Sequence, residues 1–262
     1  MKLNQIILFF ALVLPASIVM RLYQLLFTVD STTGFYTIES GNNGVILLIF
    51  IFLFCFATYI FATFAHSKPE QPPSKNVFLS ISAVLLSFAI FYDIKSISLT
   101  ANLLPWQSTL LKIAGSITAI YLITYAVLPY TNTKTPPILN TLPTIYIIIK
   151  IICDFTSISK LALISDNILL ITTYCVLLLF VLNFAKLYNG IDNEYNFKKL
   201  LSFGLVSIIL CFTNSIPYFI MNIITNNQYT HITLSTNIVI LFFGIFISVF
   251  LLSHFSKNNL SK

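Results

Sequence analysis

Apolar residues fill eight long stretches of this chain, and polar residues collect in the short segments between them. A membrane core about 30 Å thick needs roughly 20 residues of helix, and each stretch is close to that length. Within lipid the backbone must satisfy its own N–H and C=O groups, which a helix does. The pattern therefore predicts an all-α bundle of eight membrane spans. These are residues 5–27, 45–65, 77–97, 108–128, 138–155, 168–188, 200–225 and 232–254.

The composition supports one transmembrane domain over residues 1–262, with no soluble domain. Charged residues make up 8% of the chain, and the hydrophobic fraction is 57%, whereas an ordinary soluble domain is about 25% charged. The first span follows Lys2, as a secretory signal would, but it runs past Arg21 and has no small-residue cleavage site. We therefore expect it to be retained. The basic residues form no patch with aromatic residues, which argues against nucleic acid as a partner.

The loop charges predict an orientation. In an eight-span arrangement nine of the Lys and Arg residues fall on the side of the two termini and five on the other. The positive-inside rule then puts both termini in the cytoplasm. The same arrangement puts the carboxylates of Asp30, Glu39, Asp93, Asp154 and Asp166 on the outer side. The nine are Lys2, Lys68, Lys75, Lys134, Lys186, Lys198, Lys199, Lys257 and Lys262, and the five are Arg21, Lys95, Lys112, Lys150 and Lys160.

Several charges lie inside the predicted spans, where each costs at least a few kcal/mol near the bilayer centre. Lys150 and Asp154 are four residues apart, so they share one face of the fifth span, with Tyr146 one turn earlier. One interpretation is that the charges extend to the headgroups and anchor helix ends. The other is an outward-facing polar pocket in which Lys150 and Asp154 pair with groups on the first or third span. The residues of this pocket would be Arg21, Asp93, Lys112, Lys150 and Asp154.

The seventh span contains a second unusual feature, Thr213-Asn214-Ser215 followed by Pro217. Proline removes a helical hydrogen bond, and the polar side chains around it satisfy freed carbonyls. The segment predicts a helix break at Asn214 and Pro217, which serves either as a kink for packing or as part of a binding site.

The motifs of common enzymes are missing. The sequence has no HExxH, no GxSxG and no glycine-rich phosphate loop, and its three histidines are isolated. Its four cysteines lie in different apolar runs without a CxxC, which argues against a disulfide framework or a zinc site. We expect no bound metal and no organic cofactor, and we consider an enzyme less probable than a binding protein.

The order Tyr146-x3-Lys150-x3-Asp154-Phe155, with Asp166 before the next apolar run, resembles a family of uncharacterised multi-span bacterial membrane proteins. Arg21, Asp30 and Gly34 are similar to the start of the same proteins. Lys150 stands where those proteins usually have arginine. The resemblance implies a polytopic fold, a bacterial plasma membrane and an outer charged cluster, and it implies no activity.

These observations predict a non-enzymatic bundle whose outward-facing pocket binds or moves a small solute or lipid. The leading alternative is a scaffold or subunit of a larger membrane complex, with the charges pairing across the contact to another membrane protein. A lipid-modifying membrane enzyme is a third possibility.

Overall fold

The computed structural model describes residues 3–30, 36–37, 41–64, 76–97, 103–131, 136–158, 165–191, 194–224 and 233–260. These residues form eight α-helices and one short 3-10 helix, and they contain no β-strand. The elements are α1 (Leu3–Phe27), α2 (Gly41–Thr63), α3 (Val77–Ile97), α4 (Pro105–Thr131), η1 (Pro137–Thr141), α5 (Leu142–Ile158), α6 (Ser165–Tyr188), α7 (Glu194–Ile224) and α8 (Leu234–Leu260). Among the residues singled out from the sequence, Lys2, Gly34, Glu39, Lys68, Lys75, Lys134, Lys160 and Lys262 lie outside the described ranges.

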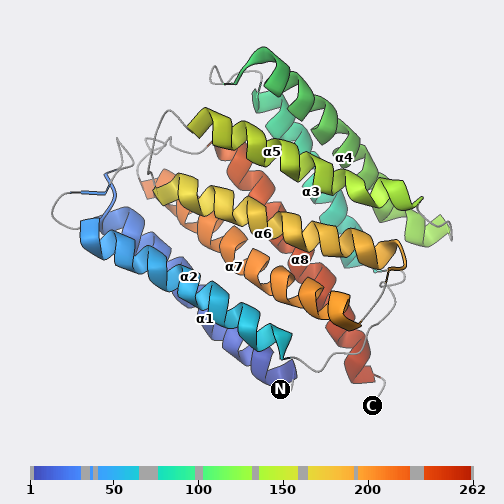
Figure 1. The fold of residues 1–262 in the computed structure, drawn as a ribbon, viewed down its shortest axis with the longest axis horizontal. Helices are drawn as coiled ribbons and strands as arrows, with labels where there is room; N and C mark the ends of the chain where they lie inside the picture. The colour runs from blue at the N-terminus through green and yellow to red at the C-terminus, as the bar shows by residue number, and fades with distance from the viewer. Residues whose placement is uncertain are drawn as a thin grey trace.

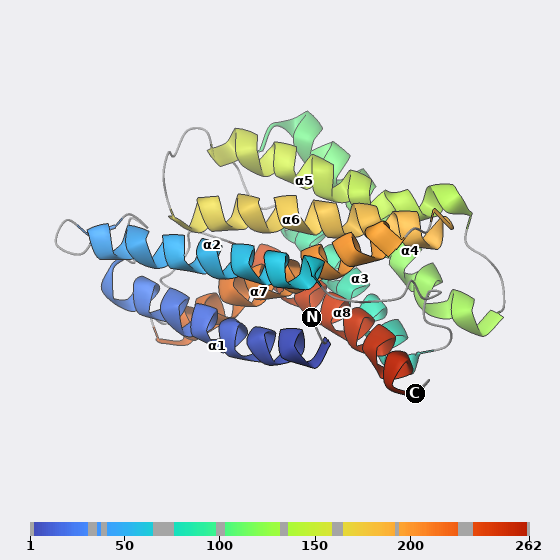
Figure 2. The same cartoon turned by 60° about the horizontal axis from the view of Figure 1, so that its bottom comes forward.

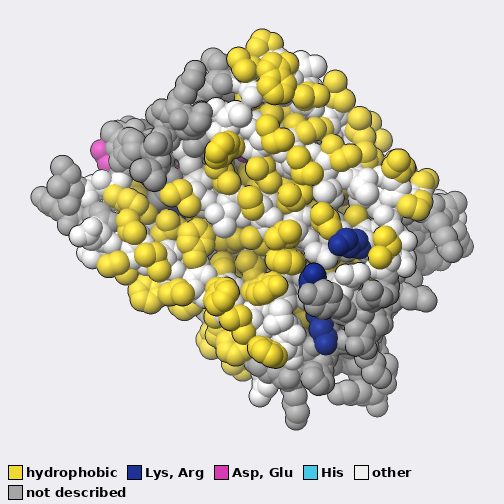
Figure 3. Space-filling model, in the orientation of Figure 1, with side chains coloured by type: hydrophobic (Ala, Val, Ile, Leu, Met, Phe, Trp, Pro, Cys, Tyr) yellow, Lys and Arg dark blue, Asp and Glu magenta, His cyan; other side chains and the backbone are white. Residues whose placement is uncertain are grey.

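All eight predicted spans are confirmed as helical segments long and apolar enough to cross a membrane. The chain is therefore an all-α, multi-pass membrane protein. The start of α1 and the end of α8 lie on the same side of the bundle (Figure 1). Apolar side chains cover most of the visible outer face, as expected for contact with lipid (Figure 3).

Local sequence signals set several helix ends. The side chain of Asn76 caps α3 by accepting hydrogen bonds from the N–H groups of Phe78 and Leu79, at 3.0 and 3.4 Å. Proline stands first in α4, where a missing N–H has no cost. After α6 the chain turns at Gly190, whose φ of 72° favours glycine.

Helices α3 to α8 form a closed ring. Each packs against the next in chain order, and α8 returns to pack against α3. Figure 1 shows α5, α6 and α7 in front of α8 and α3, and Figure 2 shows the same arrangement turned by 60°. The interior of this ring is where helices far apart in sequence face one another.

Helices α1 and α2 form a hairpin outside the ring. They pack against each other and against α7, so α7 has neighbours on all sides. The membrane-spanning window of α7 is 83% buried, compared with 22% for α1 and 28% for α2. The chain thus consists of a six-helix ring with a two-helix hairpin attached to one of its members.

The segment around Pro217, for which the sequence predicts a kink or a break, does not interrupt the seventh helix. Helix α7 continues without interruption from Glu194 to Ile224 and includes Pro217. Neighbouring helices surround it, and the hydroxyl of Ser215 donates 2.7 Å to the carbonyl of Cys211 one turn earlier. Packing against neighbouring helices lets a membrane helix continue through a proline. Asn214 is buried on this continuous helix.

Candidate functional site

Charged side chains from different helices meet at one end of the ring, where α3, α5 and α7 end and α4, α6 and α8 begin. We call this the polar end. Lys150 on α5 extends its ammonium nitrogen to within 3.3 Å of Asp93 Oδ2 on α3. The same nitrogen lies 3.8 Å from Asp154 Oδ1, one turn further along α5. We refer to Asp93, Lys150 and Asp154 as the lysine cluster.

The first turn of α8 contributes hydroxyl groups to the lysine cluster. Ser235 donates to Asp93 Oδ1 at 2.8 Å, and Thr236 donates to the same oxygen at 3.4 Å. The ammonium of Lys150 also lies 3.5 Å from the Thr236 hydroxyl. The buried carboxyl group of Asp93 therefore accepts from an ammonium and two hydroxyl groups, which offsets the cost of its burial.

Two tyrosines complete the surroundings of the cluster. Tyr146 on α5 and Tyr174 on α6 are fully buried, and both interact electrostatically with Lys150 and the two carboxylates. Neither phenol hydroxyl has a hydrogen-bond partner among the residues that the structure describes. A buried polar group without a partner costs about 1–3 kcal/mol, so these two hydroxyls are the strongest indication that the cluster serves a ligand.

The cluster is buried on one side and reaches the surface on the other. Lys150 stands eight residues before the end of α5, about 12 Å along the helix axis at 1.5 Å per residue. Its side chain is 5% exposed and that of Asp93 is 1% exposed, whereas Asp154 is 16% exposed. Asp154 therefore lies at the rim of the cluster.

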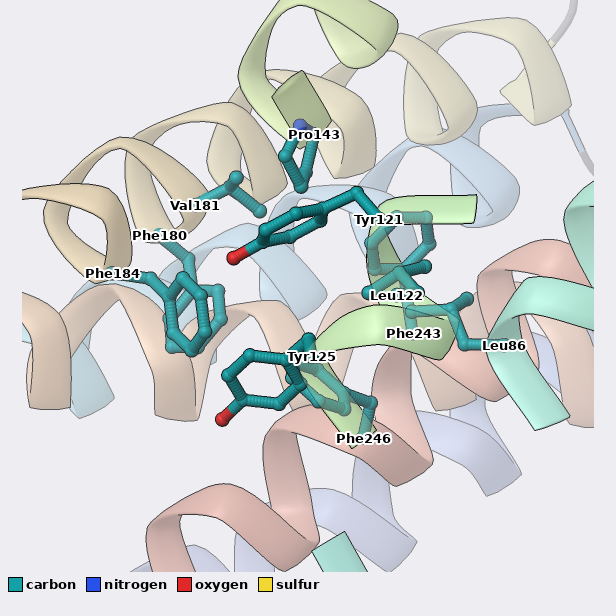
Figure 4. A pocket seen from close by; sticks show the side chains of 10 residues that line it. All are labelled: Leu86, Tyr121, Leu122, Tyr125, Pro143, Phe180, Val181, Phe184, Phe243 and Phe246. Carbon is teal, nitrogen blue, oxygen red and sulfur yellow. The ribbon is translucent and has the colours of Figure 1, made fainter. Parts of the chain in front are cut away.

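The opposite half of the ring interior is apolar. Aromatic and aliphatic side chains from α3, α4, α5, α6 and α8 enclose a cavity of about 20 Å³ (Figure 4), and a single water molecule needs about 10–15 Å³ measured this way. The hydroxyls of Tyr121 and Tyr125, which line it, bond elsewhere, to Asn140 and Tyr188. We call this packed half of the ring interior the aromatic plug. Its lining residues are Leu86, Tyr121, Leu122, Tyr125, Pro143, Phe180, Val181, Phe184, Phe243 and Phe246.

A second buried charged group lies at the polar end but joins the hairpin to the ring. Arg21 on α1 pairs with Asp166 in the first turn of α6, and it also donates to Gln24. Gln24 in turn donates to the Tyr36 hydroxyl at 2.6 Å and to the Gly44 carbonyl at 2.8 Å. We refer to Arg21, Gln24 and Asp166 as the arginine cluster. Asp166 sits at a helix N-terminus, where the helix dipole favours an anion.

The five residues that the sequence predicts for one pocket do not all meet in the structure. Three of them lie together: Asp93, Lys150 and Asp154. The structure places Arg21 in the separate arginine cluster, so the expected contact of Arg21 with the fifth span is replaced by a pair with Asp166. Lys112 is half-buried on α4 and takes part in none of the three ion pairs found among the described residues.

Sequence reasoning missed the contributions of Tyr174, Ser235 and Thr236. A signal for the last two was available, since hydroxyl residues open the eighth span and a nearby buried carboxylate needs donors. Nothing in the sequence of α6 singles out Tyr174 from the other tyrosines.

No group of three His, Cys, Asp or Glu side chains is arranged to hold a metal ion within the described part of the chain. All four cysteines are free thiols. Comparison with protein-family models, with curated proteins and with solved structures gives no match. The resemblance to a bacterial family therefore stays a hypothesis, and the functional argument depends on the geometry alone.

Proposed function

We propose that this protein is a non-enzymatic, multi-pass membrane protein that binds or moves a small polar or charged solute, or a lipid headgroup, at the lysine cluster. The observation that carries the proposal is a pair of buried tyrosine hydroxyls near three charged groups. Neither hydroxyl has a hydrogen-bond partner among the described residues. Membrane proteins retain such costly groups mainly at ligand and ion sites. The aromatic plug below the cluster closes the ring interior toward the other end.

The proposed orientation has both termini in the cytoplasm of a bacterial cell and the polar end facing outward. The nine-to-five distribution of Lys and Arg supports it. Labelling of a Glu39→Cys variant, made in a chain without its natural cysteines, tests the orientation. If this cysteine is labelled only from the cytoplasmic side, the protein has the orientation opposite to the proposed one.

The alternative of a scaffold predicts charges on the outer surface, ready to pair with another protein. Two of the three ion pairs join different helices of this chain: Arg21 with Asp166, and Lys150 with Asp93. Their side chains are at most 5% exposed. This arrangement supports an internal site over an external charged contact.

The experiment is a thermal-stability screen of the purified protein in detergent against small ions, amines, organic acids and lipid headgroups. A ligand that binds only the folded state raises the midpoint of unfolding by mass action. We expect at least one compound to stabilise the wild type and to lose its effect in Lys150→Gln and Tyr174→Phe.

The matched control is Lys112→Gln, which removes a lysine charge at the same end of the bundle outside the three ion pairs. It should leave the response to that compound unchanged. A response that survives in Lys150→Gln, or an absence of any response across the screen, would contradict the proposed site.

A further inference from the structure

We infer that the ion pair between Lys150 and Asp93 is a latch that closes the ring interior at the polar end. A ligand reaches the hydroxyls of Tyr146 and Tyr174 only when this latch opens. The inference rests on the proposed function and specifies how access to the same site is controlled. It follows from the helices that the pair joins, from the depth of the tyrosines, and from the partners that remain when the pair separates.

The ion pair crosses the interior of the ring. Helix α5 packs against α4 and α6, whereas α3 packs against α4 and α8. The ammonium of Lys150 on α5 nevertheless lies 3.3 Å from Asp93 Oδ2 on α3 and 3.5 Å from the Thr236 hydroxyl on α8. One side chain therefore connects α5 with two helices that are not next to it in the ring, and it covers the interior between them.

The two tyrosines lie deeper in the ring than the latch. At 1.5 Å per residue, Asp93 is about 6 Å from the end of α3, whereas Tyr174 is about 14 Å from the start of α6 and Tyr146 about 18 Å from the end of α5. Both tyrosines are fully buried, and neither hydroxyl has a hydrogen-bond partner in the described part of the protein. Pro143, on the same helix as Tyr146 and further from the polar end, already lines the aromatic plug. The tyrosines therefore lie between the latch and the aromatic plug.

Both members of the latch keep polar partners when it opens. Lys150 has a second carboxylate on its own helix, since Asp154 Oδ1 lies 3.8 Å from the ammonium at the rim. Asp93 keeps the hydroxyls of Ser235 and Thr236, which donate to it at 2.8 and 3.4 Å. Movement of the ammonium from Asp93 to Asp154 therefore costs less than complete separation of a buried ion pair. A lysine with two alternative partners on different helices is a two-state element of the kind that gating requires.

The test measures how fast a water-soluble thiol reagent labels a buried reporter cysteine in the purified full chain in detergent. The reporter is Tyr174→Cys, made in a chain whose four natural cysteines are replaced. We expect slow labelling in this chain. Addition of Asp93→Asn should speed labelling at least severalfold, because Lys150 then keeps only its rim carboxylate and the open arrangement becomes more populated.

Three comparisons show whether the latch itself is responsible. Asp154→Asn removes the other carboxylate of the same ammonium but spares the latch, so it should not speed labelling. Lys112→Gln removes a lysine charge at the same end outside the three ion pairs, so it should leave the rate unchanged. A reporter at Phe184→Cys, in the aromatic plug, should stay slow when Asp93→Asn is added.

Equal labelling of Tyr174→Cys with and without Asp93→Asn would overturn the latch. A matching rise at Phe184→Cys would also overturn it, since the ion pair would then only brace the whole ring. If Asp93→Asn does not fold, Lys150→Gln takes its place with the same expected rise. If a Lys150-dependent compound emerges from the ligand screen while Asp93→Asn leaves the labelling rate unchanged, the proposed function stands and the latch does not. Faster labelling without any compound in the screen would support the latch and contradict the proposed function.

Discussion

The two buried charged clusters lie at the same end of the bundle but differ in their contacts and in position. The arginine cluster pairs one guanidinium with one carboxylate, Asp166, and Gln24 extends it to backbone and hydroxyl groups of the hairpin side. The lysine cluster sets one ammonium against two carboxylates and reaches the surface at Asp154. The first joins α1 to α6, and the second lies within the ring.

This difference separates a structural ion pair from a candidate site. The Arg21–Asp166 pair joins α1 of the hairpin to α6 of the ring, so its role is to hold the hairpin on the ring. The lysine cluster lies near two buried tyrosine hydroxyls that have no hydrogen-bond partner in the described part of the chain, and a ligand that bonds them relieves that cost. The predictions below test whether the two clusters really behave in these different ways.

The largest effect is expected from Asp166→Asn. It leaves Arg21 charged and buried without its carboxylate, which costs about 3–5 kcal/mol in free energy of unfolding. The double variant Arg21→Gln with Asp166→Asn removes both charges and should recover a large part of that loss. Unfolding of the purified proteins by denaturing detergent measures both. Strictly additive losses would mean that the two residues do not interact.

Lys150→Gln should destabilise the protein by about 2–4 kcal/mol at pH 8, because it leaves two carboxylates together in the interior. As the pH falls to 5, protonation of a carboxylate removes their repulsion, so the loss should shrink. Asp166→Asn leaves an arginine that stays charged at any pH used, so its loss should not shrink in this way. Denaturation at the two pH values compares them, and equal pH dependence would remove the distinction between the clusters.

A third comparison concerns one uncharged residue at each cluster, Gln24 and Tyr174. Gln24→Met breaks hydrogen bonds to Tyr36 and Gly44 and should cost about 2 kcal/mol. Tyr174→Phe removes a hydroxyl that has no partner in the described structure, so the free energy of unfolding should rise by about 1–3 kcal/mol while the response to ligand falls. The same unfolding assay is used for both. A large loss in Tyr174→Phe would show that its hydroxyl has a structural role.

The smallest effect is expected from Lys112→Gln. Its side chain is half-buried on α4 and belongs to neither cluster, so the free energy of unfolding should stay within about 0.5 kcal/mol of the wild type. A loss comparable to that of Lys150→Gln would show that the outer pocket expected from the sequence includes Lys112 after all.

The sequence by itself determined the class of the protein and the spans. Lipid requires a helical backbone, so eight apolar stretches of about 20 residues are sufficient to predict eight helices. The i, i+4 spacing of Lys150 and Asp154 was also sufficient to place them on one face, where the structure finds them 3.8 Å apart.

Only the tertiary structure decided which helices face one another and which charges meet. Most of these helices are apolar around their whole circumference, and lipid is as apolar as a neighbouring helix, so the pattern along the chain does not mark the packed face. The pairing of Arg21 with Asp166 spans 145 positions, and that of Lys150 with Asp93 spans 57. The same closure of the ring brought Ser235 and Thr236 to Asp93 and made α7, with Pro217 inside it, the most buried helix.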